Sequence, residues 1–195
     1  IVHTGNPVRA ALLHGEAQAG RRLVSCPPGR PLLLVLGGSL GSAAVNRMVA
    51  QCLDTLLQAC FVVHQMGPAQ FQESKREGYH RAPFFAEELP HLLAAADLVV
   101  CRAGANTLWE LAALGKPSIL IPLPAWASRG DQIGNARHFA GAGAALVIEE
   151  TAPADGGETR AAEADGRRLA AAVLRRLGDR ATLIQMGKHA AALGR

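Results

Sequence analysis

Residues 32–41 read LLLVLGGSLG, which is an unbroken apolar run followed directly by a glycine-rich stretch. A short apolar run bounded by glycines is typical of a β-strand that is buried on both faces. From Ser42 to Gln58 the pattern changes, because apolar side chains recur at helical spacing between Val45 and Leu56. The stretch therefore predicts a strand, a tight turn and a helix, which together form the repeating unit of a parallel sheet.

The same alternation continues along the chain. Further strands are expected at residues 61–63, 82–85, 98–101, 118–121 and 145–148, and helices at 89–95, 107–114, 131–140, 167–177 and 181–193. Residues 69–77 are expected to form a polar helix or loop, and residues 152–165 a polar loop. Apolar strands that alternate with helices indicate an α/β fold with a Rossmann-like parallel sheet and helices on both faces. Ligands of such sheets bind beyond the carboxyl ends of the strands.

Composition narrows the class of protein. A chain of 195 residues with 49% hydrophobic and 18% charged residues is neither a disordered tail nor a coiled coil. Only 4% of residues are aromatic and the net charge is +4, so no nucleic-acid partner is expected. The turn-rich residues 1–30 predict a connector from another domain, and residues 31–195 a single domain. Because the chain begins with Ile1 rather than Met, we expect it to be a piece of a longer protein.

The sequence lacks several patterns that reactive centres require. It contains no D-x-D pair of carboxylates for Mg²⁺ or Mn²⁺ and no G-x-S-x-G nucleophile motif. None of the four cysteines forms a C-x-x-C pair, and no histidine cluster has zinc spacing. We therefore expect neither a metal nor another cofactor.

The glycine-rich turn of residues 37–41 is the first candidate site. Gly37, Gly38 and Gly41 would let backbone N–H groups approach a phosphate, and the following helix adds about half a positive charge. Ser39 offers a hydroxyl group. The turn is neither a G-x-G-x-x-G fingerprint nor a Walker A loop. A tight turn without a ligand is the alternative, and the turn alone does not decide between the two.

A second small-residue turn, RAGANT at residues 102–107, follows the strand that ends at Cys101. Thr107 and Glu110 have the spacing of a capping box, in which Glu110 only closes on backbone N–H groups. In the functional alternative, the Glu110 carboxylate accepts hydrogen bonds from a ribose diol, as acidic residues do in other doubly wound folds. The spacing alone favours the capping box.

A third turn leads into the helix that begins near Asp131. Gln132 and Asn135 are three positions apart, so their amides lie on one helix face, where they can read sugar hydroxyls. A solvated first turn with Asp131 as the N-cap is the alternative.

Seven motifs in a fixed order carry a family resemblance. They are TGNPVR at 4–9, GGSLG at 37–41, HQMG at 64–67, CRAGANTLWE at 101–110, GKP at 115–117, DQIGNA at 131–136 and GAGA at 141–144. In this order they closely resemble the carboxyl-terminal half of the MurG family, transferases that add N-acetylglucosamine to the lipid-linked muramyl-pentapeptide precursor of peptidoglycan. The resemblance implies the donor-binding half of a two-domain glycosyltransferase of the B fold, without its acceptor-binding domain.

The resemblance also implies a role for each matching residue in a site for UDP-N-acetylglucosamine. Arg9 and Ser39 would contact the diphosphate, and the backbone near Ala86 would meet the uracil. Glu110 would hold the ribose hydroxyls and Gln132 the sugar hydroxyls. The helix-start N–H groups offered to the diphosphate would be those of Ala105, Asn106, Thr107, Leu108 and Trp109.

The activity implied by the resemblance is an inverting, metal-independent transfer from UDP-N-acetylglucosamine to lipid I, which yields lipid II. Helix N-termini and an arginine would stabilise the departing UDP, while the general base would lie on the missing domain, so this part alone would be inactive. The implied partners are the lipid-linked acceptor and an anionic membrane surface, at the cytoplasmic face of the bacterial cell membrane. The alternatives are another UDP-sugar transferase or epimerase of the same fold, and a nucleotide-sugar binding module that works with a partner subunit.

Overall fold

The computed structural model describes residues 7–152 and 158–194, whose six strands form a parallel sheet in the order β3-β2-β1-β4-β5-β6. The strands are β1 Leu32–Leu36, β2 Phe61–Gln65, β3 Tyr79–Ala82, β4 Leu98–Cys101, β5 Ser118–Leu120 and β6 Ala145–Val147. The Rossmann-like parallel sheet expected from the sequence is therefore confirmed.

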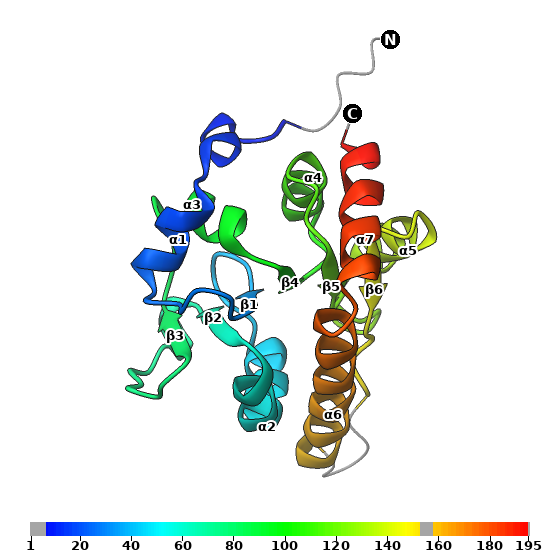
Figure 1. Cartoon of the computed structure of the whole chain (residues 1–195). Helices are drawn as coiled ribbons and strands as arrows, with labels where there is room; N and C mark the ends of the chain where they lie inside the picture. The colour runs from blue at the N-terminus through cyan, green and yellow to red at the C-terminus, as the bar shows by residue number, and fades with distance from the viewer. Residues whose placement is uncertain (1–6, 153–157, 195) are drawn as a thin grey trace.

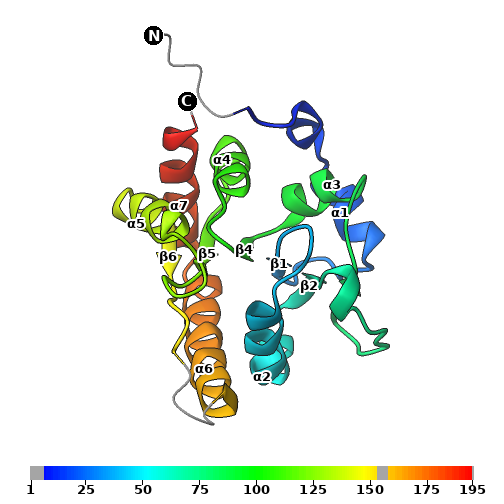
Figure 2. The same cartoon turned by 180° about the vertical axis from the view of Figure 1, so that it is seen from behind.

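Helices cover both faces of this sheet. They are α1 Ala17–Leu23, α2 Ala43–Ala59, α3 Leu89–Ala95, α4 Ala105–Ala113, α5 Asp131–Gly141, α6 Glu158–Leu177 and α7 Arg180–Leu193, with short 3₁₀ turns at Ala10–His14 and Pro68–Gln70. Helices α2 and α6 lie on one face, and α1, α3 and α4 lie on the other (Figures 1 and 2). Among the helices of the described residues, none is both long enough and apolar enough to cross a membrane.

Strand β1 divides the apolar core in two, which explains why its sequence is apolar throughout. Leu32, Leu34 and Leu36 pack into the cluster beneath α3 and α4, whereas Leu33 and Val35 pack against α2 and α6. All five side chains of β1 are buried. A strand between two helical layers has no solvent-facing side, so it shows no polar alternation.

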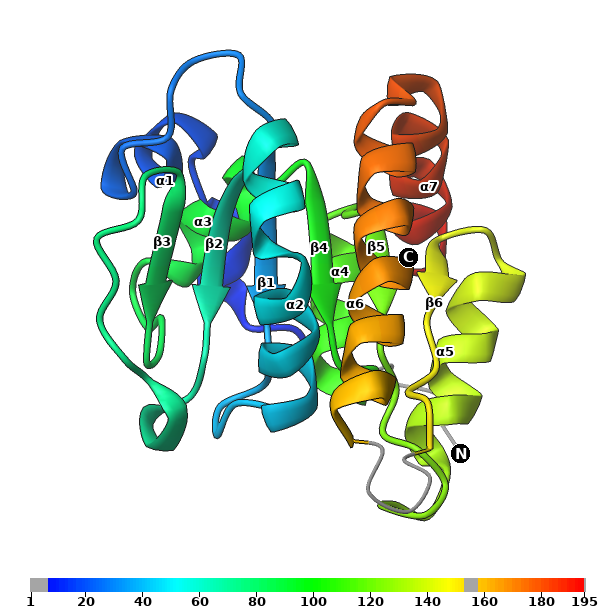
Figure 3. The ribbon, with the colours of Figure 1, turned by 90° about the horizontal axis from the view of Figure 1, so that it is seen from below.

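The order of the strands creates a crevice next to β1. From β1 the chain runs outward through β2 to β3, then returns to β4 on the other side of β1. The loops that follow β1 and β4 therefore leave the sheet in opposite directions, at the lower edge of the sheet in Figure 3. Parallel sheets bind their ligands at such a switch point.

Two predicted elements were misplaced. The strand expected at 82–85 is β3 at Tyr79–Ala82. It is an edge strand whose last three residues are only partly buried, so its sequence contains polar residues that do not resemble a buried strand. The polar loop expected at 152–165 is wrong in its second half, because α6 already begins at Glu158. Thr159, Arg160 and Glu163 are exposed residues of this helix rather than of a loop, whereas Asp165 is buried.

The segment before β1 contains structure that the sequence analysis did not predict. Helix α1 packs on α3 so closely that a Cβ atom at Gly20 would lie 2.1 Å from the His91 carbonyl oxygen. Leu12 and Val24, on either side of α1, are buried in the core. Residues 10–24 therefore pack as part of this domain, while residues 4–6 of the TGNPVR motif lie outside the described residues.

Candidate functional site

Two adjoining cavities open at the carboxyl ends of β1 and β4. The larger, of about 520 Å³, extends from the glycine-rich turn of residues 37–41 to Arg102 and Gln132. The smaller, of about 170 Å³, is lined by Arg9, Ser39 and Glu110 among others. Both contain Leu36, Gly38 and Thr107 in their walls, so they form one groove. We call it the switch-point groove, and the turn of residues 37–41 the glycine loop.

The conformation of the glycine loop requires its glycines. Gly38 and Gly41 have φ angles of 88° and 80°, in the left-handed region that side chains disfavour. A Cβ atom at Gly41 would also lie only 2.0 Å from the Met66 carbonyl oxygen. The loop thus packs backbone to backbone on the turn after β2 and leaves Ser39 exposed in the groove wall. Both interpretations of the turn share this geometry, so its role in phosphate binding stays a prediction.

Helix α4 begins earlier than the capping-box interpretation requires. Its first residue is Ala105 and its N-cap is Gly104, so Thr107 lies inside the helix and the capping box is wrong. The Leu108 N–H donates to the Gly104 carbonyl at 3.0 Å, and Trp109 packs its ring on Phe139 with centroids 6.0 Å apart. Of the N–H groups expected to face a phosphate, only those of the first turn, from Ala105 to Thr107, precede the helical hydrogen-bond ladder.

Glu110 is bound by Arg9. The Arg9 Nε donates to Glu110 Oε1 at 2.7 Å and Nη2 donates to Oε2 at 3.1 Å. The Glu110 side chain is 12% exposed, whereas that of Arg9 is 57% exposed. The hydrogen bond to Glu110 raises the pKa of the Arg9 guanidinium. A ligand that uses the Glu110 carboxylate must therefore share it with Arg9 or displace Arg9 from it.

Gln132 also lies in the groove, but half of its amide is already used. Its Oε1 accepts a hydrogen bond from the Leu123 N–H at 3.1 Å, so its amide nitrogen is the group left for a ligand. Asn135 Nδ2 donates to the Ala103 carbonyl at 3.1 Å and thereby ties α5 to the loop after β4. The N-cap of α5 is Gly130, so the expectation that Asp131 caps this helix is wrong.

Ala86 does not line the smaller cavity itself, but it follows two residues after Phe84, which does. The Ala86 N–H donates to Glu88 Oε2 at 3.1 Å, and both residues are exposed. A base that bonds to this N–H must displace the Glu88 carboxylate. That exchange takes place in solvent, so it costs little.

Arg102 stands directly after β4 and has a structural role that the sequence pattern did not indicate. Its Nε donates to Ser42 Oγ at 3.0 Å, and its Nη1 donates to the Ile121 and Pro122 carbonyls at 3.1 and 3.2 Å. Glu150 forms an ion pair with the same Nη1. Arg102 therefore joins the loops that follow β1, β4, β5 and β6. Residues of the first three loops line the groove, whereas Glu150 of the fourth lines a neighbouring pocket. Its position directly after a predicted strand was the feature of the sequence that could have indicated a role at the groove.

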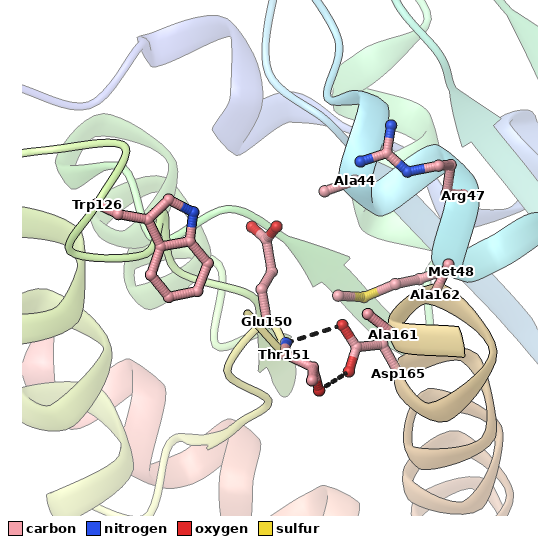
Figure 4. A pocket seen from close by; sticks show the side chains of 9 residues that line it. All are labelled: Ala44, Arg47, Met48, Trp126, Glu150, Thr151, Ala161, Ala162 and Asp165. Carbon is pink, nitrogen blue, oxygen red and sulfur yellow. Dashed lines mark hydrogen bonds between the residues drawn. The ribbon is translucent and has the colours of Figure 1, made fainter. Parts of the chain in front are cut away.

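A small pocket of about 130 Å³ adjoins the groove and shares Ala44 and Arg47 with it. Figure 4 shows Trp126 on the opposite side of this pocket from Arg47, with Glu150 between them. Thr151 closes its floor by donating from N and Oγ1 to Asp165 at 3.0 and 2.6 Å.

Another cavity, of about 660 Å³, lies at the opposite edge of the sheet beside Pro31, Asp97 and Pro117. It opens at the amino ends of the strands, where parallel sheets do not bind ligands. Over residues 7–152 and 158–194, the structure holds no group of three or more His, Cys, Asp or Glu side chains suited to a metal ion.

Comparison with known proteins agrees with this geometry. Residues 32–193 match the glycosyltransferase family 28 C-terminal domain. A UDP-N-acetylglucosamine–N-acetylmuramyl-(pentapeptide) pyrophosphoryl-undecaprenol N-acetylglucosamine transferase of Clostridium kluyveri is 44% identical over 76% of this chain and 43% of its own length. The transferase of the same name from Clostridium perfringens is 46% identical over 75% of this chain and 42% of its own length.

Solved structures show the same fold. The crystal structure of Acinetobacter baumannii MurG matches 98% of this chain and 53% of its own, with a TM-score of 0.64 and 25% identity. WaaG, a glycosyltransferase of lipopolysaccharide biosynthesis, has a TM-score of 0.61 at 18% identity and shares the fold. The chain spans about two fifths of the length of its curated relatives. It belongs to the glycosyltransferase family 28 C-terminal domain family.

Proposed function

We propose that the switch-point groove binds UDP-N-acetylglucosamine. The chain is then the donor-binding part of a transferase that moves N-acetylglucosamine to lipid I and forms lipid II. The observation that carries this proposal is the convergence of four chain segments on one groove. Arg9, the glycine loop, the start of α4 with Glu110, and Gln132 of α5 all line its two adjoining cavities. Together they offer a cation, backbone N–H groups, a carboxylate and an amide, which match the parts of a nucleotide sugar.

The diphosphate of the donor lies against the first turn of α4 in this proposal. The positive end of the helix dipole, the Arg9 guanidinium and the Ser39 hydroxyl then face the negative charge. Charge grows on the departing UDP as the bond to the sugar breaks, and preorganised donors stabilise it. This arrangement supplies by protein groups what a metal ion supplies elsewhere, so neither a metal nor another cofactor is proposed.

The ends of the donor extend in opposite directions from the diphosphate. The ribose hydroxyls donate to Glu110 once Arg9 has moved to the phosphates, and the uracil meets the backbone at Ala86. The sugar lies in the larger cavity, where the Gln132 amide nitrogen donates to one of its hydroxyls. Exchange of a buried or half-buried hydrogen-bond partner for a ligand group of the same kind leaves no polar group unsatisfied.

The acceptor and the general base are assigned to another part of the protein. The three carboxylates of the described residues that line the groove and its side pocket, Glu110, Glu150 and Asp165, are each ion-paired with an arginine. A carboxylate that is held in an ion pair is not positioned to accept a proton from an acceptor hydroxyl, so we expect the 195-residue chain to bind the donor without transferring sugar. A lipid-linked acceptor, an anionic membrane surface and a place at the cytoplasmic face of the cell membrane complete the proposal.

Thermal unfolding with nucleotides tests this function. UDP and UDP-N-acetylglucosamine should stabilise the chain in the presence of a chelator, by about 2.7 kcal/mol at 100 times the dissociation constant. ADP at the same concentration is the control and should have a smaller effect. No stabilisation at millimolar UDP, or a strict requirement for Mg²⁺, would contradict the donor site. If the chain converts UDP-N-acetylglucosamine in the absence of any acceptor, an epimerase or hydrolase of the same fold is favoured instead.

A further inference from the structure

Gln65, the last residue of β2, joins two loops that border the groove. Its side chain is buried, with 4% of the residue exposed. Its Nε2 donates to the Gly38 carbonyl of the glycine loop at 2.8 Å. Its Oε1 accepts a hydrogen bond from the Phe85 N–H at 3.0 Å. Phe85 belongs to residues 83–88, which we call the base-side loop because Ala86 lies in it.

The two partners fix the orientation of the amide. Gly38 presents only a carbonyl acceptor and Phe85 only an N–H donor at these positions. A flipped amide would place two donors together at one end and two acceptors at the other. Gln65 therefore acts as a spacer of defined length and polarity between the glycine loop and the base-side loop.

The end of β2 is itself held firmly, which makes it a suitable anchor. Asn46 Nδ2 donates to the Met66 carbonyl at 2.9 Å, and Asn46 Oδ1 lies 2.9 Å from His64 Nε2. A Cβ atom at Gly67 would lie 2.2 Å from the Leu40 carbonyl oxygen, so the backbones of the two turns touch. Because protein interiors are closely packed, a rigid anchor makes the position of one loop depend on the position of the other.

We propose that Gln65 is a positioning residue for donor binding, which sets the separation between the loop that meets the diphosphate and the loop that meets the uracil. This inference rests on the proposed function. Gln65 lines the smaller cavity, but both hydrogen-bonding groups of its amide are already paired with Gly38 and Phe85, so it acts on the donor through these two loops. Its loss should weaken a ligand that spans both loops and leave ligands that use only one loop nearly unchanged. UDP spans both loops, whereas uridine and pyrophosphate each use one.

Gln65→Glu turns this relationship into a pH-dependent one. A protonated carboxyl has the shape and polarity of the amide, because its O–H can donate to Gly38 and its C=O can accept from Phe85. An ionised carboxylate would face the Gly38 carbonyl oxygen without a proton between them. Burial raises the pKa of such a carboxyl above its ordinary value of about 4.3, so we expect it to be mostly protonated at about pH 5.5 and mostly ionised at about pH 8.5.

Other titratable groups surround the site and need a reference. Arg9 and Glu110 share the smaller cavity with Gln65, and His80 and Glu88 lie at or near the base-side loop. Arg81 of β3 and His64 of β2 flank the same strand pair. UDP itself also titrates near pH 6. The ratio of the variant's dissociation constant to that of the wild type, measured at each pH, removes these shared contributions. Gln51→Glu on the exposed face of α2 adds the same charge away from the groove.

Calorimetry with UDP at pH 5.5 and 8.5 decides the matter. We expect Gln65→Glu to bind UDP within threefold of the wild type at pH 5.5 and about tenfold or more weakly at pH 8.5, the loss expected for two hydrogen bonds. Gln51→Glu should follow the wild type at both values. Gln65→Met, measured at pH 7, should bind UDP about tenfold more weakly while uridine binding changes less than threefold.

The outcomes separate this inference from the proposed function. A wild type that does not bind UDP contradicts the donor site itself. A wild type that binds UDP, with Gln65→Glu equal to it at both pH values, overturns the positioning role alone. If Gln65→Glu unfolds at pH 8.5 by circular dichroism, Gln65→Met decides: unchanged UDP affinity, or equal losses for UDP and uridine, overturns the role.

Discussion

Arg9 and Glu110 hold each other through two hydrogen bonds of 2.7 and 3.1 Å across a separation of 101 positions in the sequence. Arg9 precedes the first helix of the described chain, whereas Glu110 belongs to α4 at the switch-point groove. The two side chains proposed for the diphosphate and the ribose thus satisfy each other when no ligand is bound. Donor binding in this account is an exchange of partners, in which Arg9 leaves Glu110 for the phosphates.

The Arg9→Met variant tests the phosphate contact of Arg9 separately from the ribose contact of Glu110. The variant loses the guanidinium that faces the phosphates, so UDP should bind about tenfold to hundredfold more weakly, as expected for a hydrogen bond to a charged group. Uridine carries no phosphate and no longer competes with Arg9 for Glu110, so its affinity should stay the same or increase. Calorimetry measures both, and Arg22→Met on the exposed side of α1 is the control. Equal weakening of UDP and uridine would contradict the exchange.

Glu110→Gln tests the ribose contact. The wild type should prefer UDP to 2′-deoxy-UDP, because the carboxylate accepts from the 2′-hydroxyl. The variant should bind UDP about 1.5–3 kcal/mol more weakly and lose most of that preference. The free energy of unfolding should fall by less than about 1 kcal/mol, since Arg9 is 57% exposed and its ion pair is screened by solvent. An unchanged preference for UDP in competition binding would remove Glu110 from the site.

The lowered pKa of buried His64 makes the stability of the fold depend on pH. Burial, helped by the positive charge of Arg81, lowers the pKa of His64 to about 4. Its ring nitrogens lie 2.9 Å from Tyr79 Oη and Asn46 Oδ1. The unfolded chain binds a proton at about pH 6.5, where the folded chain does not, so the free energy of unfolding should fall as the pH drops from 6.5 to 4. The full loss is about 3 kcal/mol.

Urea denaturation between pH 4 and 7.5 measures this slope. His64→Gln keeps groups that can bond to Tyr79 and Asn46 but does not titrate, so its stability should depend less on pH. His14→Gln, on an exposed side chain, should keep the slope of the wild type. The same slope in His64→Gln and the wild type would show that other groups cause the acid sensitivity.

Two glycines of the glycine loop form a matched pair. Gly38 and Gly41 have similar positive φ angles, but space around a Cβ atom is open at Gly38 and closed at Gly41. Gly38→Ala should cost about 1–2 kcal/mol, the penalty of a left-handed backbone. Gly41→Ala should cost about 3 kcal/mol or more, because its Cβ atom would also meet the Met66 carbonyl. Equal losses in urea denaturation would contradict the backbone contact between the two turns.

The sequence predicted the parts of the fold whose physical cause is local. Residues 32–36 are apolar because both faces of β1 are buried, so the strand was visible without the structure. Strand β3 was displaced in the prediction because its edge position leaves His80 and Arg81 half exposed. Helix α1 was not predicted, since what stabilises it is contact with α3 through Gly20, and a glycine in a helix looks like a turn in the sequence.

The candidate site was predictable as a set of loops but not as a set of contacts. Carboxyl ends of parallel strands share one edge, so residues 37–41, 102–110 and 132 were expected together, and the two cavities unite them. The partners of Glu110 and Arg102 were not predictable, because Arg9 and Glu150 are distant in sequence and their spacing carries no periodic signal. Thr107 and Glu110 mimicked a capping box because the start of α4 is set by Gly104.

Amide hydrogen exchange with and without UDP tests the central claim most directly, because it reports where the nucleotide binds. The account predicts slower exchange in the glycine loop, in the base-side loop at residues 83–88 and at the start of α4, with no change beside Arg30 and Ile184. Those two residues line the separate cavity of about 660 Å³ at the amino ends of the strands, outside the switch-point groove. Protection confined to that cavity, with none in the switch-point groove, would contradict the donor site.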